Sequence, residues 1–163
     1  MNIRLAHIDD QEGVWEIFSQ VIRSGDTYIF DPKTPRMALG DLWFAPHMET
    51  YVLEGQGKIL GTYIIKPNQI GLGNHIGNCS YMVHAEAQGR GLGKILCAHS
   101  LQRAKELRYT GIQFNCVVST NRAALALWGK FGFRVIGTTP QGFRHATLGL
   151  VDTHIMYRDL GDL

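Results

Sequence analysis

The stretch AEAQGRGLGK, residues 85–94, places a glycine at every second position from Gly89 to Gly93 and ends on Lys94. Glycine leaves the backbone N–H groups uncovered, and a helical pattern begins at Gly91. A glycine-rich turn that leads into a helix binds anions, because free N–H groups converge and the helix dipole favours negative charge. The stretch therefore indicates a phosphate site, although a tight turn before a capped helix would use the same residues without a ligand.

The glycine spacing excludes two common phosphate motifs. A Walker A loop requires Ser or Thr after its lysine, whereas Lys94 is followed by Ile95. A dinucleotide fingerprint requires G-x-G-x-x-G near the first strand, and here G-x-G-x-G lies in the middle of the chain. The stretch fits neither motif.

No other cluster of reactive side chains is evident from spacing. The 3 cysteines, Cys79, Cys97 and Cys116, are an odd number without C-x-x-C spacing, so they predict neither a disulfide framework nor a zinc site. The 7 histidines are dispersed and form no H-x-x-x-H pair. We expect no bound metal.

The N-terminal half predicts strands and helices that hold the glycine stretch in place. Residues 2–8 alternate apolar and polar like a half-buried strand, and residues 9–22 carry apolar side chains at helical spacing. A short helix is expected over 37–44. Two strands flank the turn EGQGK at residues 54–58, and a further strand at 78–84 leads into the glycine stretch.

The C-terminal half continues this alternation. After the helix that begins at Gly91, a strand is expected at 111–118 and a helix over STNRAALALWGKFGF, which begins at residue 119. Strands at 133–137 and 153–157 follow, separated by a loop. This order predicts one mixed sheet with helices on both faces, in a single domain that spans residues 1–163.

Two segments resemble the signatures of the GCN5-related N-acetyltransferase (GNAT) superfamily. MVHAEAQGRGLGKIL resembles its acetyl-CoA signature, [RQ]-x-x-G-x-[GA], with Gln88, Gly91 and Gly93 at the defining positions. NRAALALWGKFGF resembles its second signature, an Asn that opens a helix ending in a GF strand. The resemblance covers essentially the whole chain. It implies an α+β (mixed α/β) domain with a twisted mixed sheet of about seven strands, a splay between strands 4 and 5, helices on both faces, and acetyl-CoA as co-substrate.

The resemblance also implies which residues hold the coenzyme. Backbone N–H groups of residues 89–94 would cradle the pyrophosphate with Arg90 and Lys94 as countercharges, and the backbone of residues 82–84 would pair with the pantetheine arm. Asn121 would bond the pantetheine or the sulfur, or would merely cap its helix. Trp128 stands where the family often has a tyrosine that serves as the general acid. Trp128 would instead lie in the core or form a wall beside the coenzyme. The expected coenzyme-binding residues are Met82, Val83, His84, Gln88, Gly89, Arg90, Gly91, Leu92, Gly93, Lys94, Asn121 and Trp128.

The acetyl group would be transferred by direct attack of a neutral amine, so the site must orient that amine and stabilise an oxyanion. The catalytic candidates are Asn115 and Asn78, in the strands expected to flank the splay, and Tyr81. Asn is depleted from strand interiors, and a buried amide without partners costs about 1–3 kcal/mol. Either Asn would therefore face the cavity, or would cap a strand end or bond a neighbouring loop. Tyr81 would pass a proton or merely pack.

The acceptor would enter beside residues 25–36 and 140–149, which contain Tyr28, Phe30, Phe143, Arg144 and His145. An aromatic wall with a guanidinium suits a small amino-acid-like substrate that bears a carboxylate. The sequence resembles N-acetyltransferases of proline analogues such as azetidine-2-carboxylate, and more distantly those of phosphinothricin or methionine sulfoximine, which implies detoxification. The alternatives are a protein N-terminal or lysine acetyltransferase and a non-catalytic acyl-CoA-binding module.

The composition restricts the partners. The chain is 45% hydrophobic and 18% charged, with a formal charge of +2 and scattered Lys and Arg, so no nucleic-acid partner is expected. The first residues do not read as a secretion signal, and no stretch is apolar over the length that spans a bilayer. We therefore expect a cytoplasmic protein without membrane attachment, and a homodimer is possible from the resemblance.

Overall fold

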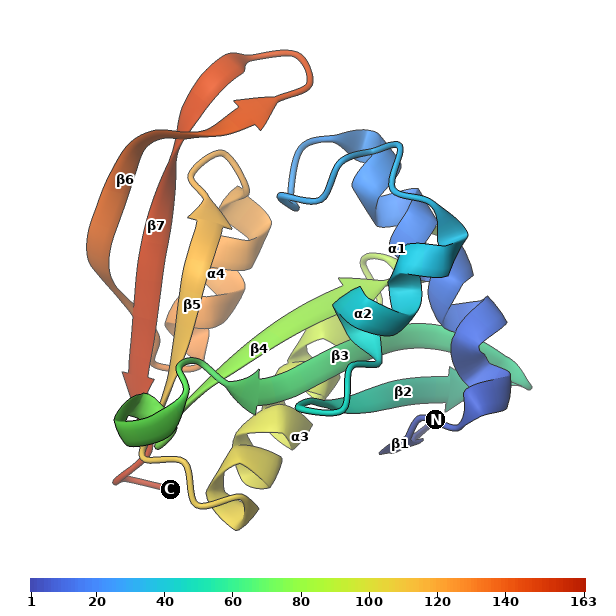
Figure 1. Ribbon diagram of the computed structural model, residues 1–163, viewed down its shortest axis with the longest axis horizontal. Coiled ribbons are helices and arrows are strands. Elements are labelled where there is room, and N and C mark those ends of the chain that lie inside the picture. The colour runs from blue at the N-terminus through green and yellow to red at the C-terminus, as the bar shows by residue number, and fades with distance from the viewer.

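The computed structural model describes residues 1–163 and is built around one sheet of 7 strands in the order β1-β2-β3-β4-β5-β7-β6 (Figure 1). All neighbouring strands are antiparallel except β4 and β5, which are parallel. The strands are β1 (Asn2–Leu5), β2 (Glu49–Gly55), β3 (Lys58–Pro67), β4 (Ile76–Val83), β5 (Gly111–Val118), β6 (Arg134–His145) and β7 (Gly149–Asp159). The helices are α1 (Gln11–Ser24), α2 (Leu39–Trp43), α3 (Leu92–Glu106) and α4 (Arg122–Lys130), with four 3₁₀ turns between elements.

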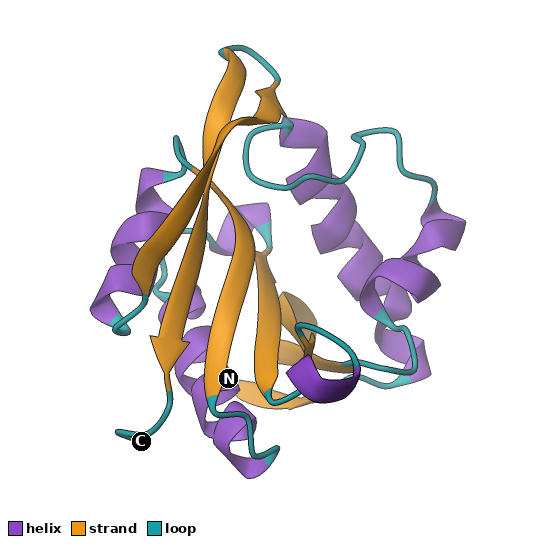
Figure 2. Cartoon of the chain, turned by 60° about the vertical axis from the view of Figure 1, so that its left-hand side comes forward, coloured by secondary structure: helices purple, strands orange, loops and turns teal.

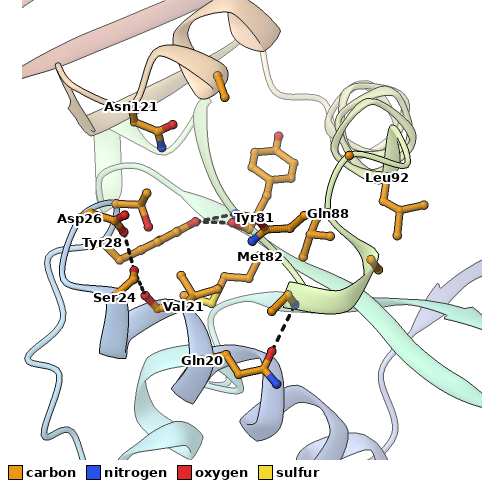
Figure 3. A pocket seen from close by; sticks show the side chains of 16 residues that line it. Gln20, Val21, Ser24, Asp26, Tyr28, Tyr81, Met82, Gln88, Leu92 and Asn121 are labelled. Carbon is orange, nitrogen blue, oxygen red and sulfur yellow. Dashed lines mark hydrogen bonds between the residues drawn. The ribbon is translucent and has the colours of Figure 1, made fainter.

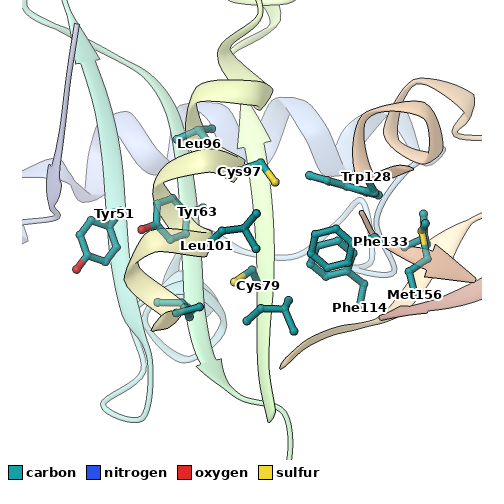
Figure 4. Packing of buried hydrophobic residues seen from close by; sticks show 14 of the residues in the cluster. Tyr51, Tyr63, Cys79, Leu96, Cys97, Leu101, Phe114, Trp128, Phe133 and Met156 are labelled. Atoms are coloured by element: carbon teal, nitrogen blue, oxygen red, sulfur yellow. The ribbon is translucent and has the colours of Figure 1, made fainter. Parts of the chain in front are cut away.

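Helices cover both faces of the sheet, as Figure 2 shows, and two apolar clusters result. The pleat separates them, because successive strand residues point to opposite faces: in β2, Tyr51 and Leu53 pack with α3, while Val52 packs with α1 and α2. Figure 4 shows the cluster on the α3 face, in which Phe114 and Trp128 meet. No helix is both long enough and apolar enough to cross a bilayer.

The parallel strands β4 and β5 separate soon after they meet. Only two residue pairs join them, Ile76 with Gly111 and Gly77 with Ile112. Beyond this point the strands diverge (Figure 1), and the gap between them is called the splay below. The predicted seven-stranded mixed sheet, its splay between strands 4 and 5 and its helices on both faces are confirmed.

The prediction of a loop between the strands at 133–137 and 153–157 was wrong. Strands β6 and β7 pair from Arg134 to His145 as a long hairpin that arches over the top of the splay (Figure 1). The sequence gives no clear strand signal here, because β6 is an edge strand that is exposed along most of its length. It also contains Pro140 and an irregularity around Gln141 (φ 52°). At the hairpin tip, the Ala146 N–H donates to the Gly25 carbonyl, 2.9 Å away, and ties the hairpin to the loop after α1.

Candidate functional site

Two cavities lie on either side of the loop that follows α1. The first has a volume of about 610 Å³ and lies against the glycine stretch; we call it the glycine-loop cavity. Figure 3 shows its lining, which is Gln20, Val21, Ser24, Asp26, Thr27, Tyr28, Tyr81, Met82, Val83, Ala85, Ala87, Gln88, Gly89, Leu92, Asn121 and Ala123. Its walls are therefore the end of α1, the edge of β4, the turn before α3 and the start of α4.

The second cavity, which we call the α2 cavity, has a volume of about 440 Å³. Its walls come from the loop after α1, from α2 and the segment behind it, from strands β3, β4 and β5, and from α4. The lining residues are Thr27, Tyr28, Ile29, Phe30, Asp41, Leu42, His47, Met48, Ile64, Lys66, Asn78, Cys79, Ser80, Tyr81, Phe114, Asn115, Cys116, Val117, Val118, Asn121, Ala124 and Trp128.

The two cavities meet at four residues that line both of them: Thr27, Tyr28, Tyr81 and Asn121. We call this place the junction. All four side chains are uncharged near neutral pH, so the junction offers hydrogen bonds without a fixed charge.

The glycine stretch has the backbone of an anion-binding turn. Gly89 (φ 76°) and Gly91 (φ 75°) adopt left-handed conformations, and an added Cβ at either position would point into open space. Gly91 is the N-cap of α3 and provides no side-chain cap, so the first N–H groups of the helix remain available to a ligand. Gly93 has a different role, because a Cβ added there would lie only 3.0 Å from Leu127 Cδ2 of α4, closer than an ordinary contact.

The flanking residues of this turn differ in their surroundings. Arg90 and Lys94 are exposed and neither takes part in an ion pair, so both cations are available as countercharges. His84 is held on α1, with its Nε2 3.2 Å from a carboxylate oxygen of Glu16. Gln20, which spacing did not single out, accepts a 3.2 Å hydrogen bond from the Ala85 N–H and ties α1 to the turn.

Asn121 has one half of its amide engaged. Its Oδ1 accepts from the Ala124 N–H at 3.2 Å and caps α4, while its Nδ2 has no protein partner and the residue lines the junction. Both roles considered from the sequence are therefore compatible in one side chain. Trp128 is at once core and wall: it is 9% exposed, its ring centroid lies 4.8 Å from that of Tyr81, and it lines the α2 cavity.

The Tyr81 hydroxyl is engaged in the core. It lies 2.7 Å from Ser100 Oγ on α3, and Ser100 in turn donates to the Cys97 carbonyl. Burial raises the pKa of Tyr81 well above its ordinary value, so the phenol is a poor acid near neutrality. Its backbone, by contrast, faces the junction, where the Tyr28 hydroxyl donates to the Tyr81 carbonyl at 2.6 Å and accepts from the Tyr81 N–H at 2.8 Å (Figure 3).

The two asparagines lie in the flanking strands and line the α2 cavity, and both also bond neighbours. Asn78 is 9% exposed and its Nδ2 donates to the Gln113 carbonyl at 2.8 Å. Asn115 is exposed; its Nδ2 donates to Asn68 Oδ1 at 2.8 Å, and its Oδ1 accepts from Gln113 Nε2 at 3.0 Å. Asn115 thus has a direct amide partner in the segment after β3, and a ligand would have to compete with it.

Only some of the expected acceptor residues meet the α2 cavity. Tyr28 and Phe30 line it, with their rings stacked at 6.0 Å. Phe143, Arg144 and His145 line neither cavity, because their segment is paired in the β6–β7 hairpin: Phe143 lies opposite Val151 and is buried, and Arg144 is exposed.

Spacing missed five polar residues of the α2 cavity: Thr27, Asp41, His47, Lys66 and Ser80. Asp41 and Lys66 make no ion pair with any protein group. They come from α2 and β3, and no motif connects them. The alternation of β3 alone places Lys66 on the face of Ile64, which was the available signal. No group of three or more His, Cys, Asp or Glu side chains lies close enough to hold a metal ion.

The comparisons with known proteins agree with this geometry. A model described as the Acetyltransferase (GNAT) family matches residues 12–133. N-acetyltransferase aca1 of Schizosaccharomyces pombe is 28% identical in an alignment 151 residues long, which covers 82% of this chain and 72% of the yeast protein. A GCN5-related N-acetyltransferase structure from Kribbella flavida is 38% identical, with a TM-score of 0.92 over 97% of this chain and 96% of that one. The structure of yncA from Salmonella typhimurium with its cofactor acetyl-CoA has a TM-score of 0.85 over 100% of this chain and 95% of that one; at 22% identity it shows the fold alone.

Proposed function

Because the chain belongs to the acetyltransferase (GNAT) family, we propose that it transfers an acetyl group from acetyl-CoA, bound in the glycine-loop cavity, to the amine of a small molecule bound in the α2 cavity. The observation that carries this proposal is the junction: two separate cavities, one of which has an anion-binding turn in its wall, open onto the same four residues. This layout suits a transfer between two ligands that meet end to end.

The glycine-loop cavity suits the coenzyme in charge and shape. The free N–H groups at the start of α3 and the cations Arg90 and Lys94 would bind the pyrophosphate. The edge of β4 beyond the splay would pair with the amides of the pantetheine arm, in the manner of an added strand. Acetyl-CoA itself supplies the thioester, whose acetyl group would then reach the junction.

The reaction needs no covalent intermediate on the protein. The neutral amine attacks the thioester carbonyl carbon, the C–S bond breaks, and the amine proton that is lost balances the proton gained by the thiolate. Two thiols line the α2 cavity, and Cys116 is only partly buried whereas Cys79 is buried. Even this partial burial raises the pKa of Cys116. A thiol that stays protonated is a weak nucleophile, which favours direct transfer over an acetyl-cysteine route.

The α2 cavity fits a small acceptor. Its volume of about 440 Å³ lies in the range of small-molecule sites, and its lining combines aromatic rings with amides and one unpaired cation, Lys66. We propose an amino-acid-like acceptor with a carboxylate, including proline analogues such as azetidine-2-carboxylate, and a role in detoxification in the cytoplasm. In this arrangement the carboxylate would be bound by Lys66, whereas Arg144 lies outside the cavity.

The test is release of free thiol from acetyl-CoA against a panel of amines. The panel contains azetidine-2-carboxylate, proline, phosphinothricin, methionine sulfoximine, polyamines and short peptides. Turnover on amino-acid-like members, with the acetylated product identified by mass, supports the proposal. Turnover on peptides alone would show a protein acetyltransferase, and coenzyme binding with no turnover on any member would favour a binding module.

A further inference from the structure

The Tyr28 hydroxyl closes the open edge of β4 at Tyr81. In a strand, successive residues direct their N–H and C=O groups to opposite edges. The N–H of His84, directly after β4, donates to Leu60 of β3, so the even-numbered residues face β3 and the odd-numbered residues, including Tyr81, face the splay. Both of the splay-facing backbone groups of Tyr81 are bonded to the one Tyr28 hydroxyl.

The Tyr28 ring is held as firmly as its hydroxyl. It stacks on Phe30 with an interplanar angle of 5° and meets Trp43 edge-on at 6.4 Å. Trp43 is fully buried and donates its Nε1–H to Thr62 at 3.0 Å, so the ring rests against the core rather than against another loop. Three residues before Tyr28, the carbonyl of Gly25 is bonded to the hairpin tip. Tyr28 therefore stands as a fixed wall of the junction.

A fixed wall at this place restricts the acyl donor. If the coenzyme and the acceptor occupy the two cavities, the thioester carbon lies at the junction, and each further carbon of the acyl chain has to pass Tyr28 toward the α2 cavity. The Tyr28 ring lines both cavities, and its two hydrogen bonds and its stacking on Phe30 hold it in place.

We propose that Tyr28 is the residue that restricts the acyl donor to two carbons. This inference rests on the proposed function, and it concerns acyl-chain length, which neither the fold nor the family determines. Tyr28 acts by steric exclusion: its ring and bonded hydroxyl occupy the space that a third and fourth acyl carbon would need.

Calorimetric binding of acetyl-CoA, propionyl-CoA and butyryl-CoA in the absence of any amine tests the inference without requiring turnover. An ill-fitting methylene changes selectivity by about tenfold or more, so the wild-type protein is expected to bind butyryl-CoA at least about tenfold more weakly than acetyl-CoA. In Tyr28→Ala and Tyr28→Leu, the ratio of the Kd of butyryl-CoA to the Kd of acetyl-CoA is expected to fall below about threefold. The fall should come from tighter binding of butyryl-CoA. The leucine variant keeps an apolar side chain at the wall in case the alanine variant does not fold.

The matched control is Met48→Ala. Met48 lines only the α2 cavity and takes no part in the ring contacts or hydrogen bonds that hold Tyr28, so shortening it enlarges the acceptor side and should leave the acetyl-to-butyryl ratio within about twofold of wild type. Equal affinity of the wild-type protein for acetyl-CoA and butyryl-CoA would overturn the inference, as would an unchanged ratio in the folded Tyr28 variants. Failure of the wild-type protein to bind acetyl-CoA at all is a separate outcome, and it would overturn the proposed function itself.

Discussion

The side-chain amide of Asn78 donates a 2.8 Å hydrogen bond to the backbone carbonyl of Gln113, one residue beyond the last pair that joins β4 to β5. The amide takes the place of the next backbone bond of the sheet and lets the two strands diverge without leaving this carbonyl unpaired. Asn78 therefore lies where β4 and β5 begin to separate, and it also lines the α2 cavity.

We expect Asn78→Ala to lower the free energy of unfolding by about 1–3 kcal/mol, the cost of a buried polar group left without its partner. Urea unfolding measures this change. Asn74→Ala is the matched control, because Asn74 is exposed and its side chain makes no hydrogen bond, so its unfolding free energy should change by less than about 0.5 kcal/mol. Equal stability of Asn78→Ala and wild type would show that the bond does not fix the splay.

The two roles of Asn121 separate in a pair of variants. Asn121→Ala removes the cap of α4 and should cost about 1 kcal/mol of stability, while Asn121→Ser keeps a cap acceptor and should be nearly as stable as wild type. If the unpaired Nδ2 binds the coenzyme, both variants lose acetyl-CoA affinity by a similar factor of about tenfold, the effect of one hydrogen bond. Urea unfolding and calorimetry give the two readouts. Wild-type affinity in Asn121→Ser would restrict Asn121 to capping.

A methyl group at position 91 should weaken the binding of acetyl-CoA to the turn before α3. The left-handed backbone of Gly91 makes Ala strained there by about 1–2 kcal/mol, and its Cβ points into the open space where the anion would bind. We expect Gly91→Ala to raise the Kd of acetyl-CoA at least about tenfold by calorimetry. Gly129→Ala is the control: this glycine lies in α4 with open space around its Cβ, and the variant should bind normally and gain about 0.5–1 kcal/mol in stability. Normal coenzyme binding by Gly91→Ala would remove this turn from the site.

Alkaline pH should destabilise the protein through its buried thiols. Burial raises the pKa of Cys79 to about 12 and that of Cys97 to about 12, whereas both thiols ionise near pH 8.5 in the unfolded chain. The stability that these groups contribute is fully present below about pH 8.5 and is lost as the pH rises toward 12, at about 1.4 kcal/mol per pH unit for each thiol.

Urea unfolding in reducing buffer between pH 8 and 10.5 measures this slope. Cys97→Ala removes one of the two thiols and should reduce the slope by about 1.4 kcal/mol per pH unit above pH 9. A slope that is the same with and without Cys97 would mean that this thiol ionises equally in the folded and unfolded chains.

The sequence allowed prediction of those parts of the fold that strong local signals determine. The stripe of Val14, Ile17 and Phe18 reached the core as expected, and Gly89 and Gly91 adopt the backbone conformations for which glycine is required. The β6–β7 hairpin was recognised only at its base, as the strands expected at 133–137 and 153–157. Its outer part could not be recognised because β6 buries few side chains, so its residues lack the apolar alternation that identifies a strand.

The cavities were only partly predictable, because they are made by residues far apart in the sequence. Tyr28 and Phe30 were selected for their aromatic rings and do line the α2 cavity, but the double bond between Tyr28 and Tyr81 depends on how the loop after α1 lies on β4. For Lys66 the only local signal is the alternation of β3, which places it on the face of Ile64. Only the tertiary structure shows that Lys66 lines a cavity and makes no ion pair there.

In the proposed reaction, an amino-acid-like amine in the α2 cavity takes the acetyl group from acetyl-CoA in the glycine-loop cavity. The most direct measurement is thiol release from acetyl-CoA with azetidine-2-carboxylate and with azetidine, which lacks the carboxylate, in the wild-type protein and in Lys66→Met. We predict an acetylated product, a kcat/KM at least about tenfold higher for the carboxylate than for azetidine, and loss of that preference in Lys66→Met. Absence of turnover on either amine and on the rest of the panel, with acetyl-CoA bound, would contradict the proposed acetyl transfer.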